Sequence, residues 1–263
     1  MALANLHGFR MYYEIAGQGT PLLFVHGGLG GGRGSATFRQ HHMATMAPYL
    51  TVLAFDRRAA GQSETPATGY SFDIFSRDII ALLDHLELPR AVFMGTSAGG
   101  PQVLHCALHY PERVCALVLG STATQTVNVP PELASLITFL GTDGLHQLQT
   151  MLGPAPTTAP ARPTGPLDAL SGILQTYLAY HLYGDPLTAR LAEITVPALI
   201  LHGTADAEVS FAEAQKLHAG LPASSLVPFL DGGHSIMVTH ATSYRQAILQ
   251  FLQELGLAQV LDD

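Results

Sequence analysis

The chain has 263 residues, of which 48% are hydrophobic and only 12% are charged. This composition suits one large folded domain with a substantial core and room for an insertion, and it excludes a disordered chain. The formal charge is -8 and Lys216 is the only lysine, so the sequence holds no basic cluster that would bind nucleic acid.

Targeting and redox features of the sequence are few. Residues 1–10 contain no basic stretch followed by a long apolar run, and no run of about 18 apolar residues occurs. We therefore expect no signal peptide, no membrane contact and a cytoplasmic location. Cys106 and Cys115 lie in apolar surroundings, which favours buried reduced thiols over a disulfide or metal site. His105 and His109 are spaced i, i+4, but no HExxH pattern surrounds them, so we expect no metal.

The first elements predicted in chain order are strands. Residues 4–15 predict a hairpin with a turn at His7 and Gly8. Short runs that are apolar on both faces are typical of buried parallel strands. Six of them follow, at residues 21–25, 51–55, 91–94, 116–119, 198–201 and 226–229.

Helical stretches alternate with these strands. Residues 71–88 place Phe75, Ile79 and Leu83 on one helical stripe, and Pro89 stops the helix. Residues 98–110 and 241–255 also predict helices. Strands alternating with helices indicate a mostly parallel sheet that is covered on both faces.

One segment interrupts the alternation. Residues 126–193 contain no strand-like run, but they include two predicted helices, 131–140 and 167–183, around a loop rich in Pro, Thr and Ala at 153–166. We therefore expect a core domain formed by residues 1–125 and 194–263, with residues 126–193 as a helical cap or lid.

The strongest motif is Gly95-Thr96-Ser97-Ala98-Gly99, which matches G-x-S-x-G. It directly follows a predicted strand and directly precedes a predicted helix, which is the setting of a nucleophile elbow. An ordinary glycine-rich turn is the alternative interpretation of so short a pattern. The context favours Ser97 as a nucleophile exposed on a strained turn.

A second glycine-rich loop, residues 26–32, follows the strand at 21–25. Glycines let backbone N–H groups approach a substrate, where they can stabilise an oxyanion. We expect an oxyanion hole formed by the N–H of Ala98 and that of either Gly28 or Leu29. The loop lacks the signatures of a P-loop and of a dinucleotide site.

A serine nucleophile needs a base, and the base needs an acid to orient it. His234 follows the last predicted strand, and Asp206 follows the strand at 198–201. The chain order Ser97, Asp206, His234 is the order expected for this architecture. Glu208 and Asp231 are weaker candidates for the acid.

In these motifs and their order the chain resembles the α/β-hydrolase superfamily, in its small lid-bearing branch. The resemblance covers nearly the whole chain and implies a mostly parallel eight-stranded sheet flanked by helices, with the lid inserted after strand six. Relatives commonly have Gly-His where this chain has Ala59 and Ala60, a departure outside the expected triad. Relatives that are haloalkane dehalogenases or epoxide hydrolases attack with an aspartate, so Ser97 excludes their chemistry.

The expected function is that of a serine hydrolase acting on an ester, thioester or lactone of modest, apolar character, without a cofactor. Phe139, Tyr177 and Tyr180 of the lid are the expected substrate contacts, although packing of the lid onto the core would also explain them. The expected partner is a small molecule, and a homodimer is compatible with the sequence. Two alternatives stay open on this fold: another triad chemistry (perhydrolase, C–C hydrolase, lyase or cofactor-free oxygenase) and a small-molecule receptor.

Overall fold

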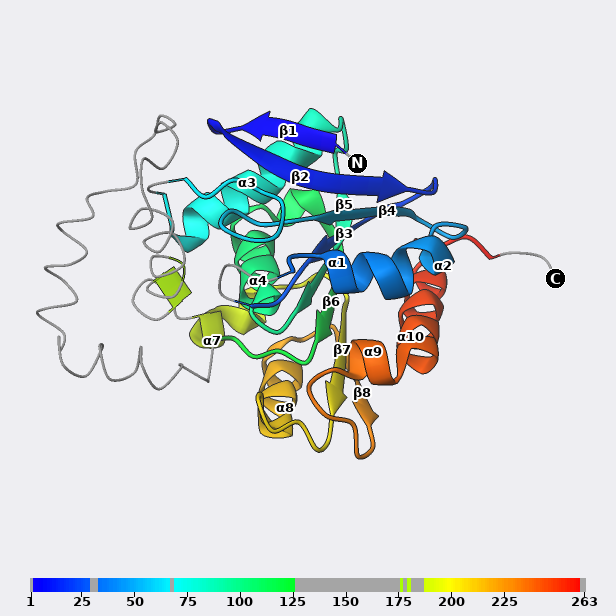
Figure 1. Cartoon of the computed structure of the whole chain (residues 1–263). Coiled ribbons are helices and arrows are strands. Elements are labelled where there is room, and N and C mark those ends of the chain that lie inside the picture. Colours follow the sequence, from blue (N-terminus) through cyan, green and yellow to red (C-terminus); the bar gives the residue numbers. More distant parts are fainter. Residues whose placement is uncertain are drawn as a thin grey trace, which may run out of the picture.

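The computed structural model describes residues 2–28, 33–66, 69–125, 176, 179–180 and 187–260 (Figure 1). The expected lid helices therefore lie largely outside the described residues, as do Leu29, Phe139 and Tyr177. The described residues of the expected lid include the short helices α7 (Leu187–Arg190) and η3 (Leu191–Glu193). The division into core and lid stays a prediction.

In the described part of the chain, one sheet of eight strands forms the centre of the molecule, in the order β1-β2-β4-β3-β5-β6-β7-β8. Strands β1 and β2 pair antiparallel, β2 pairs antiparallel with β4, and all other neighbours are parallel. The predicted hairpin and the six predicted strands are all present. Their bounds are β1 Ala2–Leu6, β2 Phe9–Ala16, β3 Pro21–Val25, β4 Thr51–Phe55, β5 Ala91–Thr96, β6 Val114–Gly120, β7 Ala198–Gly203 and β8 Ser224–Phe229.

The register of the parallel strands aligns their carboxyl ends. Val25 lies level with Gly95, Gly95 with Leu119, and Gly120 with Leu201. The loops that follow β3, β5, β6 and β7 therefore leave the sheet at one edge. Ligands bind at this edge in open parallel sheets.

Helices cover both faces of the sheet (Figure 1). On one face lie α3 (Phe72–His85), α4 (Gly99–His109), α7 and α8 (Phe211–Gly220). On the other lie the segment formed by α1 (Ala36–Phe38), η1 (Arg39–Met43) and α2 (Ala44–Met46), together with α9 (Ile236–Thr239) and α10 (Ala241–Glu254). A short turn, η2 (Pro111–Arg113), precedes β6.

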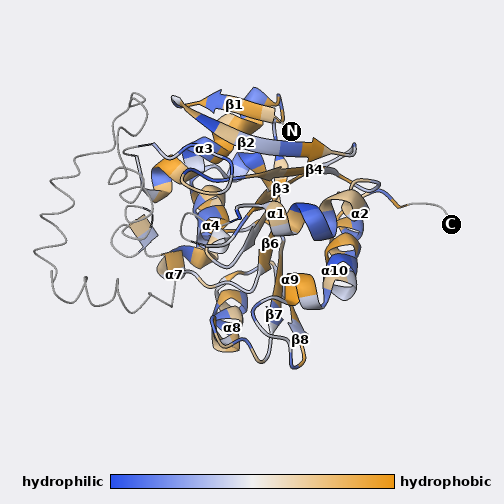
Figure 2. Ribbon diagram, viewed as in Figure 1, coloured by the Kyte–Doolittle hydropathy of each residue, from blue (hydrophilic) through white to orange (hydrophobic). Residues whose placement is uncertain are grey.

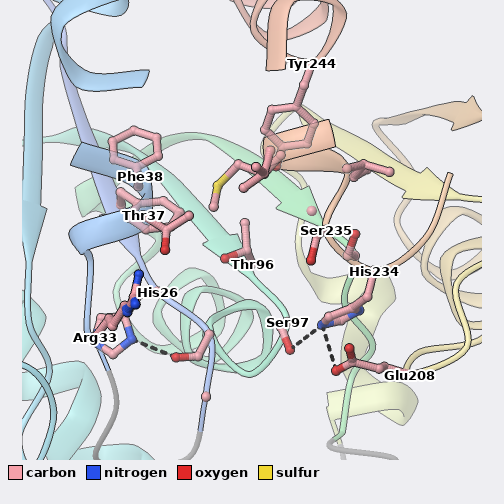
Figure 3. A pocket seen from close by; sticks show the side chains of 18 of the residues that line it. His26, Arg33, Thr37, Phe38, Thr96, Ser97, Glu208, His234, Ser235 and Tyr244 are labelled. Carbon is pink, nitrogen blue, oxygen red and sulfur yellow. Dashed lines mark hydrogen bonds and ion pairs between the residues drawn. The ribbon is translucent and has the colours of Figure 1, made fainter. Parts of the chain in front are cut away.

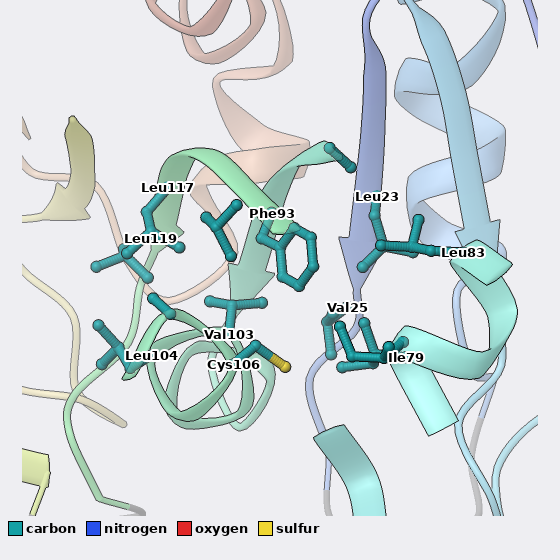
Figure 4. Close-up of a cluster of buried hydrophobic side chains, with 14 of the residues drawn as sticks. Leu23, Val25, Ile79, Leu83, Phe93, Val103, Leu104, Cys106, Leu117 and Leu119 are labelled. Atoms are coloured by element: carbon teal, nitrogen blue, oxygen red, sulfur yellow. The ribbon is translucent and has the colours of Figure 1, made fainter. Parts of the chain in front are cut away.

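Alternation along the strands divides the core between the two faces. In β3, Leu23 and Val25 pack with Ile79 of α3, whereas Leu22 and Phe24 belong to the cluster on the opposite face. Figure 4 shows the first cluster, and Figure 2 shows the hydrophobic residues along the central strands. Because the central strands are buried on both faces, they appear in the sequence as continuous apolar runs.

The helix boundaries differ from the predicted ones in detail. Helix α3 starts one residue later than predicted because Ser71 is its N-cap and accepts a hydrogen bond from the N–H of Ile74. It ends at His85, before Pro89, and Glu87 is left-handed, with φ +54°. The helical residues 36–46 were not predicted. Their middle is a π-helix, which has no 3.6-residue stripe to detect.

Candidate active site

Ser97 lies on a tight turn between β5 and α4. Its φ is +49°, a left-handed conformation that is strained for a residue other than glycine. The flanking glycines are required by close backbone contacts. A Cβ on Gly95 would lie 2.6 Å from the carbonyl oxygen of Gly99, and a Cβ on Gly99 would lie 2.2 Å from that of Val25. The turn therefore has the geometry of the predicted elbow.

His234 and Asp206 approach Ser97 from loops that follow neighbouring strands. His234 Nε2 lies 3.1 Å from Ser97 Oγ (Figure 3). On the other side of the ring, His234 Nδ1 lies 2.8 Å from Asp206 Oδ2. Because the carboxylate only accepts, Nδ1 carries the imidazole proton, and Nε2 is left to accept the proton of the serine hydroxyl. The structure thus brings together the three residues predicted from the G-x-S-x-G motif, from their places after predicted strands and from their order in the chain.

The Asp206 side chain is fully buried and held in place by its own loop. Its Oδ1 accepts hydrogen bonds of 2.9 Å from the backbone N–H groups of Glu208 and Val209. His202 lies beneath, with Nε2 2.8 Å from the carbonyl oxygen of Val209 and 3.3 Å from Asp206 Oδ2. Desolvation by burial lowers the pKa of His202. Asp206 is therefore fixed before any substrate arrives.

The two weaker candidates for the acid occupy other positions. Glu208 Oε2 lies 3.6 Å from His234 Nε2, the nitrogen that faces Ser97, and 68% of the Glu208 side chain is exposed. Asp231 lies in the turn after β8 with φ +53°, and its backbone N–H donates to Thr204. Among the acidic residues that the structure describes, only Asp206 lies within hydrogen-bond distance of His234 Nδ1.

The glycine loop after β3 lies directly against Ser97. A Cβ on Gly27 would lie 2.9 Å from Ser97 Cβ and 3.5 Å from Ser97 Oγ. Gly28 has φ +77° and a Cβ there would meet nothing within 4 Å, so Gly28 borders open space. Gly28 lines the same cavity as Ser97, and Ala98 follows Ser97 in the chain, whereas Leu29 lies outside the described residues; the oxyanion hole stays a prediction.

Asp56 fixes the far end of the same loop. Its buried carboxylate accepts hydrogen bonds from the N–H and the hydroxyl of Ser35, both 2.7 Å long, and from the N–H of Gln62 at 2.9 Å. It also lies 3.2 Å from Nη1 of Arg39. Asp56 thereby holds the chain where it enters the helical segment 36–46.

A cavity of about 440 Å³ opens beside Ser97 and His234 (Figure 3). Its lining includes a group of apolar and aromatic side chains, with Arg33 and Glu208 among the charged residues. The apolar and aromatic residues are Phe24, Phe38, Ile236, Met237, Val238 and Tyr244. The size and lining suit a small organic molecule.

Tyr180 is the described member of the expected substrate contacts, and it is not among the residues that line this cavity. Its hydroxyl accepts hydrogen bonds from Gln102 Nε2 at 2.7 Å and Arg57 Nη1 at 2.9 Å, and donates to the carbonyl oxygen of Ala98. Burial raises the pKa of Tyr180. The one signal in the sequence that marks Arg57 is its charge, two residues beyond the end of the apolar strand β4.

No helix in the described residues has the length and hydrophobicity to span a membrane. Within the same residues, no group of three or more His, Cys, Asp or Glu side chains is arranged to hold a metal ion.

Known proteins resemble this chain over most of its length. A hydrolase from Paraburkholderia phymatum, named for 2-hydroxy-6-oxononadienedioate and 2-hydroxy-6-oxononatrienedioate, is 30% identical over 92% of this chain and 91% of its own. The structure of an enol-lactonase from Burkholderia xenovorans superposes with a TM-score of 0.75 at 21% identity, covering 96% of this chain and all of that one. An esterase from Exiguobacterium antarcticum gives a TM-score of 0.73 at 22% identity, covering 94% and 96% of the two chains. The two structures establish likeness of fold.

Two family models match the sequence. One, described as the alpha/beta hydrolase fold, matches residues 20–158, more than half of the chain, and a second, described as TAP-like protein, matches residues 184–259. Together with the eight-stranded, mostly parallel sheet, these matches confirm the resemblance inferred from the sequence. The chain belongs to the alpha/beta hydrolase superfamily.

Proposed function

We propose that the protein is a serine hydrolase that cleaves an ester-like bond through an acyl-enzyme on Ser97. The observation that carries this proposal is the continuous chain of hydrogen-bonding contacts from Asp206 to His234 to Ser97. Such a chain activates an otherwise inert hydroxyl, because the imidazole takes its proton as the bond to the substrate forms.

The proposed chemistry uses groups of the polypeptide and one water molecule. Ser97 Oγ attacks the carbonyl carbon, and its proton passes to His234 Nε2. The oxyanion of the tetrahedral intermediate accepts hydrogen bonds from the backbone N–H of Ala98 and from that of Gly28 or Leu29. Collapse of the intermediate expels the leaving group, which takes the proton from His234. Water, activated by the same imidazole, then hydrolyses the acyl-enzyme while Asp206 orients the base.

The cavity supports a substrate of modest size and mainly apolar character. Its volume of about 440 Å³ and its aromatic and aliphatic lining suit a small ester, thioester or lactone. The similarity in fold to an enol-lactonase and to an esterase is consistent with this class. The cytoplasmic location expected from the sequence, and a homodimer, remain parts of the proposal that rest on the sequence alone.

A second candidate is hydrolysis of a carbon–carbon bond in a small, unsaturated hydroxy-oxo dicarboxylic acid. The observation that favours it is the name of the Paraburkholderia phymatum relative, a hydrolase of 2-hydroxy-6-oxononadienedioate. The same nucleophile and base would serve, with a carbon leaving group in place of an alcohol.

The test needs no knowledge of the natural substrate. The folded protein and its Ser97→Ala variant are treated with a fluorophosphonate, and adducts are located by intact mass and peptide mapping. We expect one adduct on the peptide with Ser97 and none on the variant. A folded wild-type protein that stays unlabelled would contradict the proposal and favour a receptor.

Once labelling has shown that Ser97 is reactive, product analysis on the unlabelled protein separates the two candidates. The protein is offered p-nitrophenyl esters, small lactones and a 2-hydroxy-6-oxo-dienoic acid. Turnover of the esters or lactones alone supports the ester hydrolase. Turnover of the dienoic acid at a far higher kcat/KM than any ester would replace it with the carbon–carbon hydrolase.

A further inference from the structure

We infer that Arg57 is a positioning residue that orients and polarises the peptide groups of the oxyanion hole. The inference rests on the proposed function and deepens it. It assigns a role in transition-state stabilisation to a side chain that lies outside the triad.

Arg57 binds the backbone of the glycine loop through one nitrogen of its guanidinium group. Its Nη2 donates to the carbonyl oxygen of Gly27 at 3.1 Å and to that of Gly28. Only 5% of the residue is exposed, and none of the described acidic residues pairs with its guanidinium. A buried guanidinium without a carboxylate is costly in free energy. The acceptors that Arg57 does have are two backbone carbonyls next to Ser97 and the hydroxyl of Tyr180.

His26 adds a second donor to the same peptide group. The backbone N–H of Arg57 donates to His26 Nε2 at 3.0 Å, so the ring proton is on Nδ1 and points to the carbonyl oxygen of Gly27, 2.7 Å away. Burial, followed by the charge of Arg57, holds the pKa of His26 well below its ordinary value. The neutral ring therefore keeps this tautomer, and the carbonyl of Gly27 is held from two directions.

These contacts decide where the N–H groups point. In a trans peptide the C=O and the following N–H point in opposite directions. With the carbonyl of Gly27 turned toward Arg57 and His26, the N–H of Gly28 is turned away from them. The N–H of Gly28, a candidate donor of the loop, thus belongs to a peptide that Arg57 and His26 hold by its carbonyl.

On the Ser97 side of the expected oxyanion hole, side-chain hydroxyls hold the backbone carbonyls in a similar way. Thr122 Oγ1 donates to the carbonyl oxygen of Ser97 at 2.6 Å, and this carbonyl shares its peptide with the N–H of Ala98. Tyr180 donates to the carbonyl oxygen of Ala98 and accepts from Arg57. The Tyr180 hydroxyl therefore connects Arg57 to the backbone of Ala98 at its carbonyl, so that Arg57 helps to position the residue whose own N–H is the other expected donor.

The arrangement has an electrostatic consequence. A donor on a peptide carbonyl polarises that peptide, which makes its N–H a stronger donor, and the effect is larger where water is excluded. A charged donor polarises more than a neutral one. Since the charge on the oxyanion develops in the transition state, Arg57 should affect kcat much more than KM. Simple packing of a loop predicts instead a loss of stability with no such selectivity.

The test compares Arg57→Met, Arg57→Lys and Tyr180→Phe with the wild type. The readouts are the rate constant of fluorophosphonate labelling at Ser97 and the steady-state kinetics on a p-nitrophenyl ester. We expect labelling and kcat to fall about 100-fold in Arg57→Met, in the range seen when an oxyanion donor is removed, with KM changed less than about threefold. Lysine keeps the charge but has a single ammonium group in place of the planar set of guanidinium donors, so labelling and kcat should fall about 10-fold in Arg57→Lys. We expect the same two rates to fall about 10-fold in Tyr180→Phe.

Two matched controls separate positioning from packing. Arg58→Lys alters the neighbouring buried arginine, which pairs with Asp78, and Tyr70→Phe removes a buried hydroxyl that donates to Pro66 in the cluster that also holds Tyr180. Both should lower the melting temperature while the labelling rate of the folded protein changes less than about twofold.

The outcomes are distinguishable. If Arg57→Met and Tyr180→Phe are labelled at the same rate as the wild type, the inference is overturned and the proposed function still stands. An equal loss in the two controls would also overturn it, in favour of packing. Failure of the wild type to react would remove the proposed function and, with it, the role of Arg57. If Arg57→Met does not fold, Arg57→Lys and Tyr180→Phe still decide the question.

Discussion

Asp206 binds His234 with one carboxylate oxygen and the backbone of its own loop with the other. Oδ2 lies 2.8 Å from His234 Nδ1, while Oδ1 accepts from two backbone N–H groups. An amide at this position has no charge to stabilise the imidazolium and can donate where the carboxylate only accepts. We expect Asp206→Asn to lower kcat on a p-nitrophenyl ester by roughly 10³–10⁴-fold with the fold intact by circular dichroism. Glu208→Gln is the matched change in the same loop, and because Glu208 is largely exposed we expect less than about tenfold. Equal losses in the two variants would make Asp206 and Glu208 interchangeable and refute the assignment.

Gly27 leaves no room for a side chain beside the nucleophile. A Cβ there would lie 2.9 Å from Ser97 Cβ, so either the loop or the serine must shift. Because a displacement of this kind disturbs the reacting geometry, Gly27→Ala should lower the labelling rate at Ser97 by about 100-fold. Gly233→Ala is the control, since a Cβ on Gly233 would meet nothing within 4 Å. If Gly27→Ala is labelled as fast as the wild type, the loop can move aside at little cost, contrary to the contacts that hold the carbonyl of Gly27.

Asp56 should matter for stability more than for chemistry. Its removal leaves several buried donors without an acceptor and takes one of two carboxylate partners from Arg39, which keeps its ion pair with Glu14. We expect Asp56→Ala to lower the free energy of unfolding by about 3 kcal/mol, which thermal unfolding followed by circular dichroism will detect. Asp84→Ala breaks an ion pair with Arg113 in which 62% of the Asp84 side chain is exposed, and should cost less than about 1 kcal/mol. Similar losses in the two variants would show that the Asp56 network contributes little.

His26 makes the fold sensitive to acid. Its pKa is well below the ordinary value of about 6.5 in the folded protein, so below that pH the unfolded chain binds a proton that the native state does not. Stability should therefore fall as the pH decreases below about 6.5, by up to about 1.4 kcal/mol per pH unit for this group. His42 and His202, whose pKa values burial also lowers, act in the same direction.

The measurement is the free energy of unfolding by urea between pH 7 and pH 5, on the wild type and on His26→Gln. Glutamine cannot titrate, so the variant should be less stable at pH 7 but should lose less on acidification. A slope unchanged by the substitution would mean that His26 is protonated in the native state.

The triad was predictable because its signals are local. Ser97, Asp206 and His234 each follow an apolar run, and the parallel strands carry these positions to one edge of the sheet. Chain order then distinguishes His234 from the other histidines. The helix boundaries were also close, because Ser71 caps α3 and an apolar stripe runs along it.

The support behind the oxyanion hole was not predictable in this way. Arg57 meets Tyr180, which lies 123 positions further along the chain, and no periodic or local pattern encodes such a contact. The contact of Thr122 with Ser97 depends on the register of β5 against β6. Hydrogen bonds between side chains and distant carbonyls follow from the assembled fold, and a single sequence contains no trace of them.

The parallel pairing of β6 with β7 brings together two groups of residues of the candidate active site. Ser97 and the glycine loop precede this pairing in the chain, whereas Asp206 and His234 follow it. Closing such a long-range pairing is a demanding step in folding. A molecule with its first six strands in place but β7 undocked would have a serine without a base. Titration with a fluorophosphonate should therefore count only chains whose sheet is complete, and the labelled fraction of a preparation measures how much of it has finished folding.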